Sequence, residues 1–522
     1  MERAVFLCFV SLCPVGVAQD LPQLKVGEHT FHRRQLENGL RAVAVRDTGE
    51  RVSIFMVVNA GKRHETPMTT GLAHLTEHAM YAGTAKTPLG KHDRMVHAMG
   101  GESNAFTRED YTLFYDHSIP SAQLGRVLAM EADRLRGLTL EKKPVFFERE
   151  RLRREEARTW NPKDARRELL ESLFFQVHNY GAGVVTNKGH TKAPGLDIPT
   201  IRKFYDRYYQ PNRTAVVVLG NLDPKVALDA IAKAFGGLKR GPADEPLAVE
   251  PQLTKARKKV IKVDLARDRC NFVWLVPALG HPDRPALAVL ARLLSRATSK
   301  DGSPIDAEMG TRVDQDLFQI AATGPGSREK LSRLAKKMRG DLFDATEVAE
   351  VVKLLAGKFT SLPLRSRPYF SLGGTFCVYE VLGHAEHVSK YGDAIRAVDS
   401  ETVRAVAQRY LVPKRQLTLT FESTGVATKP LPTDLSQLSR AAQEAEAAGD
   451  LDRAILAYTR LLEAGPNKMF TMIYRADRGQ LYVKKKDYDG AIRDYEAALR
   501  VMEYPAVRKL LDEAKVLRGT GK

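Results

Sequence analysis

The chain is poor in cysteine and tryptophan, and it has no long uninterrupted apolar run. Of its 522 residues only 4 are Cys and 2 are Trp. Cys8 and Cys13 lie in the first 18 residues, which leaves Cys270 and Cys377. Their spacing is not that of a zinc site, and we expect two buried free thiols. No later stretch reaches about 18 apolar residues, so we expect a soluble mature chain.

The first 18 residues have the pattern of a secretory signal peptide. Arg3 precedes an apolar run from Ala4 to Val15, and Gly16-Val17-Ala18 offers small residues at the positions that a signal peptidase reads. Cys13 does not follow a small residue, so we expect no lipoprotein anchor. The pattern predicts a secreted protein, most simply a periplasmic one.

Positive charge exceeds negative charge by a formal +18, with 81 Lys and Arg against 63 Asp and Glu. Nucleic acid, acidic polymers and an anionic membrane surface would each suit this balance. We find no basic module interleaved with stacking aromatic residues, which disfavours nucleic acid. The length is too great for one core and indicates about three domains.

One stretch, Thr70–Tyr81, is free of proline and reads as a helix. Residues four apart share a helix face, so His74 and His78 can point at one site, with Glu77 beside them. Two His and a third ligand form a catalytic zinc site, and a spare Glu can then take a proton from water. H-x-x-E-H is the inverted form of the zinc-protease motif. The alternative is a surface helix with two chance His.

The rest of the first half reads as strands and helices that alternate. Strands are expected at 41–45, 52–58, 103–107 and 111–115, a second helix at 92–99, and mostly helix from 120 to 178. Residues 19–30 read as a loose leader. The alternation favours an α+β or α/β sandwich.

The chain then repeats itself at an offset of 202 residues. Asp197, Thr200 and Arg202 recur as Asp399, Thr402 and Arg404, and Arg207-Tyr208 with Pro211 and Arg213 recurs in the same way. Each copy runs into an apolar strand, at 214–219 and 417–421. We predict two copies of one domain, at about 24–240 and 255–424, joined by a proline-containing linker at 239–254.

A second linker at 424–432 precedes a region of different composition. Gly449–Tyr458 resembles Lys486–Tyr495 at an offset of 37, close to the 34-residue tetratricopeptide period. We predict an all-α helical-repeat tail over 435–515 that binds a protein partner. A plain helical hairpin is the alternative.

The segment 71–84 around the motif resembles the active-site helix of the pitrilysin/insulinase family of inverted-zincin peptidases. Residues 100–111 resemble the family's substrate-strand motif, and Glu148 and Glu155 resemble its distal Glu pair. Read without the resemblance, this Glu pair lies in a solvated charge run. The resemblance covers about residues 30–424. It implies two homologous α/β sandwich domains of the processing-peptidase type that form a clamshell, in addition to the helical tail.

The resemblance also implies the site. Zinc would be held by His74, His78 and Glu155, with Glu148 as an orienting carboxylate and Glu77 as the base. Glu156 would replace Glu155 if the register slipped by one. Substrate would lie as an added strand beside three residues of the substrate-strand motif. They are Asn104, Ala105 and Phe106.

The sequence departs from the family in its second half. Active members carry an Arg and a Tyr there, with six residues between them, that contact the substrate. Arg312 is the nearest candidate here, but Gln319 stands seven residues on and Phe318 lacks a hydroxyl. His384-Ala385-Glu386-His387 has the wrong spacing for a second zinc motif and reads as an exposed turn. A homologous partner subunit could supply the pair, as in the mitochondrial processing peptidase.

The sequence therefore predicts a secreted zinc metalloendopeptidase that hydrolyses unfolded peptides or proteins. The alternative is a non-catalytic or partner-dependent subunit that acts as a protein-binding scaffold. A basic scaffold for acidic polymers is a third reading. The substrate, the cleavage preference, the oligomeric state and the tail's partner are not encoded in any motif.

Overall fold

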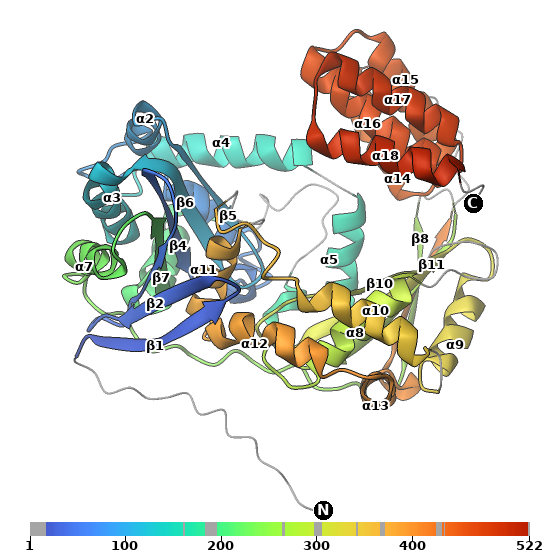
Figure 1. The fold of residues 1–522 in the computed structure, drawn as a ribbon, viewed down its shortest axis with the longest axis horizontal. Helices are drawn as coiled ribbons and strands as arrows, with labels where there is room; N and C mark the ends of the chain where they lie inside the picture. Colours follow the sequence, from blue (N-terminus) through green and yellow to red (C-terminus); the bar gives the residue numbers. More distant parts are fainter. Residues whose placement is uncertain are drawn as a thin grey trace, which may run out of the picture.

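The computed structural model describes most of the chain (Figure 1). The described residues are 17–159, 162–182, 196–263, 267–296, 305–340, 343–365, 371–423, 431–432 and 434–519. Most of the predicted signal peptide, residues 1–16, and part of the predicted second linker, residues 424–430, lie outside them.

The N-terminal half is built on a seven-stranded sheet. In their order across the sheet the strands are β1 (Gln19–Val26), β2 (His29–Gln35), β3 (Arg41–Arg46), β7 (Thr214–Gly220), β4 (Arg51–Val58), β6 (Thr112–Pro120) and β5 (Glu102–Thr107). β3 and β7 are parallel, and the other neighbours are antiparallel. β5 is therefore an edge strand.

Helices cover one face of this sheet and share a single apolar core with it. They are α1 (Leu72–Ala79), α2 (Lys91–Ala98), α3 (Leu124–Arg136), α6 (Ile198–Tyr208) and α7 (Pro224–Phe235). A further helix, α4 (Lys142–Thr159), packs against α1 and extends away from the sheet toward the C-terminal helices (Figure 1). Val145 and Leu152 anchor α4 in the same core.

The C-terminal half repeats this plan with five strands. Across the sheet they are β10 (Asp306–Met309), β11 (Asp316–Thr323), β9 (Arg269–Val276), β12 (Leu417–Ser423) and β8 (Arg257–Val263). The order β8-β12-β9-β11-β10 is that of β3-β7-β4-β6-β5, and the β8/β12 pair is again the parallel one. The two halves are thus homologous sandwiches. The exact boundaries at 24–240 and 255–424 stay a prediction.

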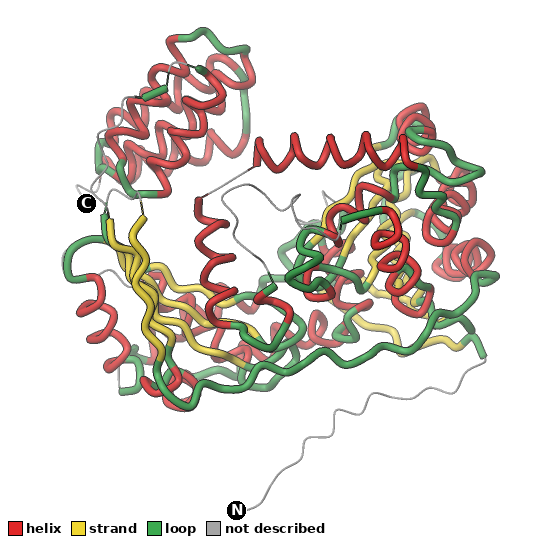
Figure 2. The backbone as a smooth tube through the Cα atoms, turned by 180° about the vertical axis from the view of Figure 1, so that it is seen from behind, coloured by secondary structure: helices red, strands yellow, loops and turns green. Residues whose placement is uncertain are grey.

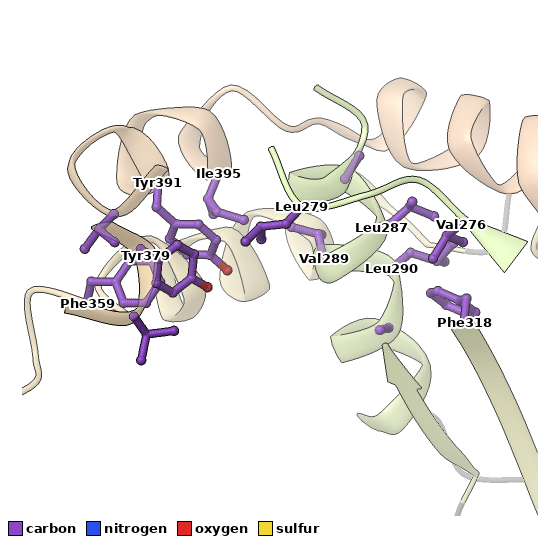
Figure 3. Close-up of a cluster of buried hydrophobic side chains, with 14 of the residues drawn as sticks. Val276, Leu279, Leu287, Val289, Leu290, Phe318, Phe359, Tyr379, Tyr391 and Ile395 are labelled. Atoms are coloured by element: carbon purple, nitrogen blue, oxygen red, sulfur yellow. The ribbon is translucent and has the colours of Figure 1, made fainter. Parts of the chain in front are cut away.

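One face of the second sheet is covered by α8 (Arg284–Arg296), α9 (Ser327–Lys337) and α13 (Ser400–Tyr410). Two further helices, α10 (Ala345–Ala356) and α12 (Ala385–Arg396), pack on α8. Figure 3 shows part of this core, in which the rings of Phe359, Tyr379 and Tyr391 lie together at one end and Phe318 of β11 at the other. Phe359 and Tyr391 meet at 4.9 Å between ring centroids.

Each half contributes one helix that packs on the sheet of the other half. α5 (Pro162–Phe174), which follows α4, packs Leu170 and Phe174 on the second sheet's opposite face. α11 (Leu372–Val381) packs on the first sheet's opposite face, where Phe376 stacks on Phe31 at 3.8 Å between ring centroids. Figure 2 shows the two sheets set apart, with helices between them.

Cys270 and Cys377 are buried free thiols, as predicted. Cys377 lies on α11, and its thiol contacts the carbonyl oxygens of Phe55 and Ala215 at 3.7 and 3.6 Å. Burial raises the pKa of Cys377 well above its ordinary value. This thiol therefore belongs to the packing between the halves.

Asp197 and Asp399 explain why the repeat is visible in the sequence. Each is the N-cap of a helix, α6 or α13, and accepts a hydrogen bond from the backbone N–H of Thr200 at 2.8 Å or Thr402 at 2.7 Å. Capping fixes where these helices begin, so the same residues recur at the same structural positions.

The prediction of a loose leader at residues 19–30 was wrong. These residues form β1 and the start of β2, an antiparallel hairpin that turns at Gly27 with φ 60°. β1 is a mostly exposed edge strand with Pro22 inside it, so it lacks the apolar alternation by which strands are recognised. Its partner β2 buries Phe31.

The tail consists of helices that pack in sequence. They are α14 (Leu435–Ala447), α15 (Leu451–Glu463), α16 (Lys468–Lys484), α17 (Tyr488–Val501) and α18 (Pro505–Gly519). Asp450 and Asp487 cap α15 and α17, again 37 residues apart. The tail contacts the body near α5, where Arg166 donates to the carbonyl of Ala447 at 3.3 Å. The tetratricopeptide assignment stays a prediction.

Within the part of the chain that the structure describes, no helix combines the length and hydropathy that a membrane span requires.

Candidate metal centre

α1 begins at a fixed point because of two residues before it. Gly71 has φ 87°, a left-handed conformation that other residues adopt only at a cost. The buried carboxylate of Glu65 accepts hydrogen bonds from the backbone N–H groups of Gly71 and Ala73 at 2.9 and 2.7 Å. A carboxylate at a helix N-terminus satisfies its orphan donors and offsets its dipole. These contacts fix the residue at which α1 begins, and therefore the direction in which its His side chains point.

The three predicted metal ligands converge. His74 Nε2 is 3.9 Å from Glu155 Oε1, and His78 Nε2 is 3.5 Å from Glu155 Oε2. The two imidazole rings lie 5.0 Å apart between centroids. Zinc bonds of about 2.0–2.2 Å set neighbouring donors of a tetrahedral site roughly 3.3 Å apart, so this donor set fits zinc after small side-chain movements.

One side of the site is open. The side chain of His78 is 6% exposed, whereas those of His74 and Glu155 are 28% and 40% exposed. A structural zinc site is closed by four protein ligands, and a catalytic site keeps a position for water or substrate. Three converging donors with one accessible side match the second kind.

Glu148 lies behind His78 on the other side of the ring. Its Oε2 is 3.4 Å from His78 Nδ1, and its side chain is 8% exposed. Burial alone would lower the pKa of His78, but hydrogen bonds to Glu148 and Glu155 outweigh it and raise that pKa to about 9. A carboxylate on Nδ1 leaves Nε2 to face the site, as orienting partners of metal-bound His do.

Glu77 is buried beside the two His, and the three donor atoms lie within 4.8 Å of one another. Its Oε2 accepts a hydrogen bond from Thr107 Oγ1 at 2.7 Å. Burial raises the pKa of Glu77 to about 7, against the opposing influence of His78 and Thr107. The Glu77 carboxylate is therefore anchored through one of its two oxygens.

The predicted substrate strand is β5, at the edge of the sheet next to α1. Asn104 is exposed and its Oδ1 accepts the backbone N–H of Ala105 at 2.9 Å. Phe106 is half-buried and lies 5.6 Å from the guanidinium of Arg108. An edge strand offers one row of backbone groups to an incoming peptide.

Two family models match the chain. Residues 41–188 match the model described as Insulinase (Peptidase family M16), and residues 196–341 match the one described as Peptidase M16 inactive domain. Together they account for more than half of the chain. The chain belongs to peptidase family M16.

Several curated relatives of the chain are named as zinc proteases. An uncharacterized zinc protease of Streptomyces coelicolor is 29% identical over 52% of this chain and 61% of its own length. Zinc protease PqqE of Helicobacter pylori is 29% identical over 51% of this chain and 61% of its own length. The chain thus spans about three fifths of the length of these relatives.

Solved structures share the M16 fold. A protease from Helicobacter pylori has a TM-score of 0.65 and 23% identity, with 76% of this chain and 100% of that chain covered. The periplasmic protease PqqL from Escherichia coli has a TM-score of 0.62 and 19% identity, over 82% of this chain and 51% of that one. Both are alike in the two-half sandwich arrangement.

Arg312, the candidate for the M16 arginine, has its guanidinium engaged within the protein. It is buried, pairs with Glu171 of α5, and lies 4.6 Å from the ring of Tyr180. Phe318 is fully buried in the second core, and Gln319 donates to Glu308. Arg312 and Gln319 line one cavity with Phe106 and Arg108 of the substrate-strand segment.

The segment His384–His387 is not an exposed turn, which corrects that prediction. His384 precedes α12, which begins at Ala385, and His387 packs its ring parallel to that of Tyr379 at 5.4 Å between centroids. The apolar residues that follow at helical spacing could have indicated a helix.

Two residues at the site were not assigned a role from the sequence. Thr107 anchors Glu77, and Glu65 caps α1. Thr107 stands in the substrate-strand motif directly after Phe106, so the motif itself held that signal. Glu65 stands six residues before Gly71 in a loop, and no local pattern marks it.

Proposed function

We propose that this M16 protein is a zinc metalloendopeptidase that cleaves peptide bonds in unfolded peptides or proteins. The observation that carries the proposal is the convergence of His74, His78 and Glu155, from α1 and α4, with Glu77 beside them. The zinc-protease names of the relatives support the same reaction.

The roles follow from the side chains. Zinc, when held by His74, His78 and Glu155, supplies a Lewis acid at the reacting carbonyl. Glu77, held by Thr107 at one oxygen, takes a proton from the attacking water and passes it to the leaving amine. Glu148 fixes the ring of His78 through Nδ1.

The substrate binds as an extended segment added to the free edge of β5. Backbone hydrogen bonds along Asn104, Ala105 and Phe106 hold it, and the exposed amide of Asn104 adds a side-chain contact. Only a chain without its own secondary structure can offer its backbone in this way, so folded proteins are poor substrates.

Removal and return of the metal tests the proposal. The purified chain, treated with a chelator, should lose hydrolysis of an unstructured fluorogenic peptide, and one equivalent of zinc should restore it. Hydrolysis that persists in the zinc-free chain would contradict the mechanism. A zinc-loaded chain with no hydrolysis of any unstructured peptide would contradict a self-sufficient enzyme.

A second candidate function is a partner-dependent or non-catalytic subunit. It is favoured by the engagement of Arg312 with Glu171 and by the burial of Phe318. Without donors that align the carbonyl, a metal site should turn over slowly. A homologous chain that lacks H-x-x-E-H and carries the Arg/Tyr pair should then raise activity on co-expression. Robust hydrolysis by the isolated chain, unchanged by such a partner, would exclude this candidate.

Secretion and tail binding complete the proposal. The signal-like residues 1–18 support a periplasmic protein, as does the start of β1 at Gln19, directly after the predicted cleavage site. The similar Escherichia coli protein is described as periplasmic. The tail would bind a protein partner through its helices. Mass spectrometry of the secreted chain should find Gln19 as its first residue.

A further inference from the structure

A second group of metal-type donors lies in the N-terminal half and shares no residue with the α1–α4 site. His92 of α2, Asp116 of β6 and Glu131 of α3 are all buried, and one donor atom of each lies within 4.8 Å of the others. The proposed peptidase mechanism uses none of them.

The donor distances suit a small divalent ion. His92 Nε2 lies 3.0 Å from Asp116 Oδ1 and 3.3 Å from Glu131 Oε1. Tetrahedral zinc with bonds of about 2.0–2.2 Å requires neighbouring donors roughly 3.3 Å apart. Calcium takes six to eight oxygen ligands at longer distances, and one imidazole with two carboxylates does not offer them.

The charges around the group are unbalanced. Asp93 lies close enough to act electrostatically on His92 and Asp116, so three carboxylates meet here with one guanidinium, that of Arg134. In the metal-binding state, with the imidazole neutral and the three carboxylates ionised, three negative charges and one positive charge leave −2. Buried charge of this size needs a counter-charge, and one divalent cation supplies it.

Several buried polar atoms at the group have no hydrogen-bond partner among the described residues. They are Asp116 Oδ2, Asp93 Oδ1 and His92 Nδ1. The side chain of Asp116 is fully buried. A buried carboxylate oxygen without a donor costs free energy unless a ligand reaches it. These oxygens are an observation independent of the donor distances.

Arg134 holds Glu131 in place. Its Nη2 lies 2.5 Å from Glu131 Oε1 and 2.7 Å from Oε2, and its Nε lies 3.2 Å from Oε2. The guanidinium itself is held between rings, 4.6 Å from that of Phe114 and 5.2 Å from that of Tyr81. An orienting cation of this kind fixes a ligating carboxylate without replacing the metal.

We propose that His92, Asp116 and Glu131 bind a second divalent ion, of the zinc class, that ties α2 and α3 to the sheet. The site is closed, because its three side chains are 9% exposed or less. It is therefore structural, with the buried Asp116 Oδ2 as its fourth donor, and takes up its ion as the chain folds.

Metal counting in a variant without the first site is the test. The His74→Ala/His78→Ala double variant, purified from zinc-containing medium and dialysed, should keep one zinc per chain by mass spectrometry. The unaltered chain should hold two. A double variant with no zinc overturns the proposal and leaves a proton shared by Asp116 and Glu131 as the account of the group.

Two further variants test whether His92 binds the remaining zinc. His92→Gln added to the double variant should remove the remaining zinc, whereas His97→Gln should keep it. His97 is a matched control, since it is exposed on the same helix and contacts only the carbonyl of Asp93, at 2.8 Å. Zinc retained in the His92→Gln variant would overturn the site.

X-ray absorption of the double variant decides the matter if His92→Gln fails to fold. One imidazole with oxygen ligands supports the site. A zinc shell without imidazole, or with two, refutes it.

Discussion

The two halves of the molecule share the order of five core strands but differ in the helix that follows the second of them. After β4 comes α1, which carries His74 and His78 toward α4. After β9 comes α8, which is buried along most of its length and packs against α10, α12 and α13. The same architecture thus gives a metal-type site where a helix keeps one face open, and a second core where other helices cover it.

The two halves nevertheless depend on each other for their packing. α5 covers one face of the second sheet, and α11 covers one face of the first. The buried carboxylate of Glu380 on α11 also pairs with Arg33 of β2 at 2.7 Å. Neither half can bury its sheet alone, so the half without metal-type donors has a structural role in the half that has them.

The largest expected effect comes from the ligand that α4 contributes. Glu155→Ala should lose both zinc at the α1 site and peptide hydrolysis, because two His alone do not close the ligand set. Glu156→Ala is the matched control and should keep both. Metal analysis and a peptide assay measure this. The reverse pattern would mean that the register along α4 is shifted by one residue.

Glu148→Gln should have an intermediate effect. The neutral amide lacks the negative charge that Glu148 places beside His78 Nδ1. Zinc affinity at the α1 site should therefore fall by about 10–100-fold. Competition with a chromogenic chelator gives the affinity. An unchanged affinity would show that Glu148 does not orient the ring.

Arg33→Ala tests the contact between the halves. It leaves Glu380 buried without its partner, and the free energy of unfolding should fall by about 3 kcal/mol. Arg34→Ala, on the same strand, removes pairs with the exposed Asp20 and Asp229 and should cost far less. Urea unfolding compares the two. Equal losses would mean that the halves are not coupled through this pair.

Removal of the tail should have the smallest effect. A chain that ends at Pro432 loses the contact of Ala447 with Arg166 and the packing of Ala448 on the second sheet's core. Zinc content should be unchanged, and so should the rate of hydrolysis of small peptides. An insoluble or zinc-free truncation would show that the tail is part of the body.

Local sequence patterns predicted the features that depend on residues close together in the chain. The spacing of His74 and His78 indicated a shared helix face, and the N-caps Asp197 and Asp399 made the repeat recognisable from the order of residues alone. The exchange of α5 and α11 could not be predicted, because it depends on contacts between residues far apart in the chain. The β1 strand was missed since its stability comes from pairing with β2.

The assignment of Glu155 depended on a resemblance for the same reason. It lies 77 residues beyond His78, and its own segment reads as a solvated charge run. Only the packing of α4 on α1 brings the two side chains together. Glu65 contributes through two hydrogen bonds to the start of α1, which leave no periodic trace in the sequence.

Glu77→Gln is the most direct test of the central claim, that Glu77 moves protons and the two His with Glu155 hold zinc. The variant should keep the zinc of the unaltered chain, because the proposed ligands are His74, His78 and Glu155. Hydrolysis of an unstructured peptide should fall by on the order of 10²–10⁴-fold, as expected when a general base is removed. Full activity in the zinc-loaded Glu77→Gln variant would contradict the account.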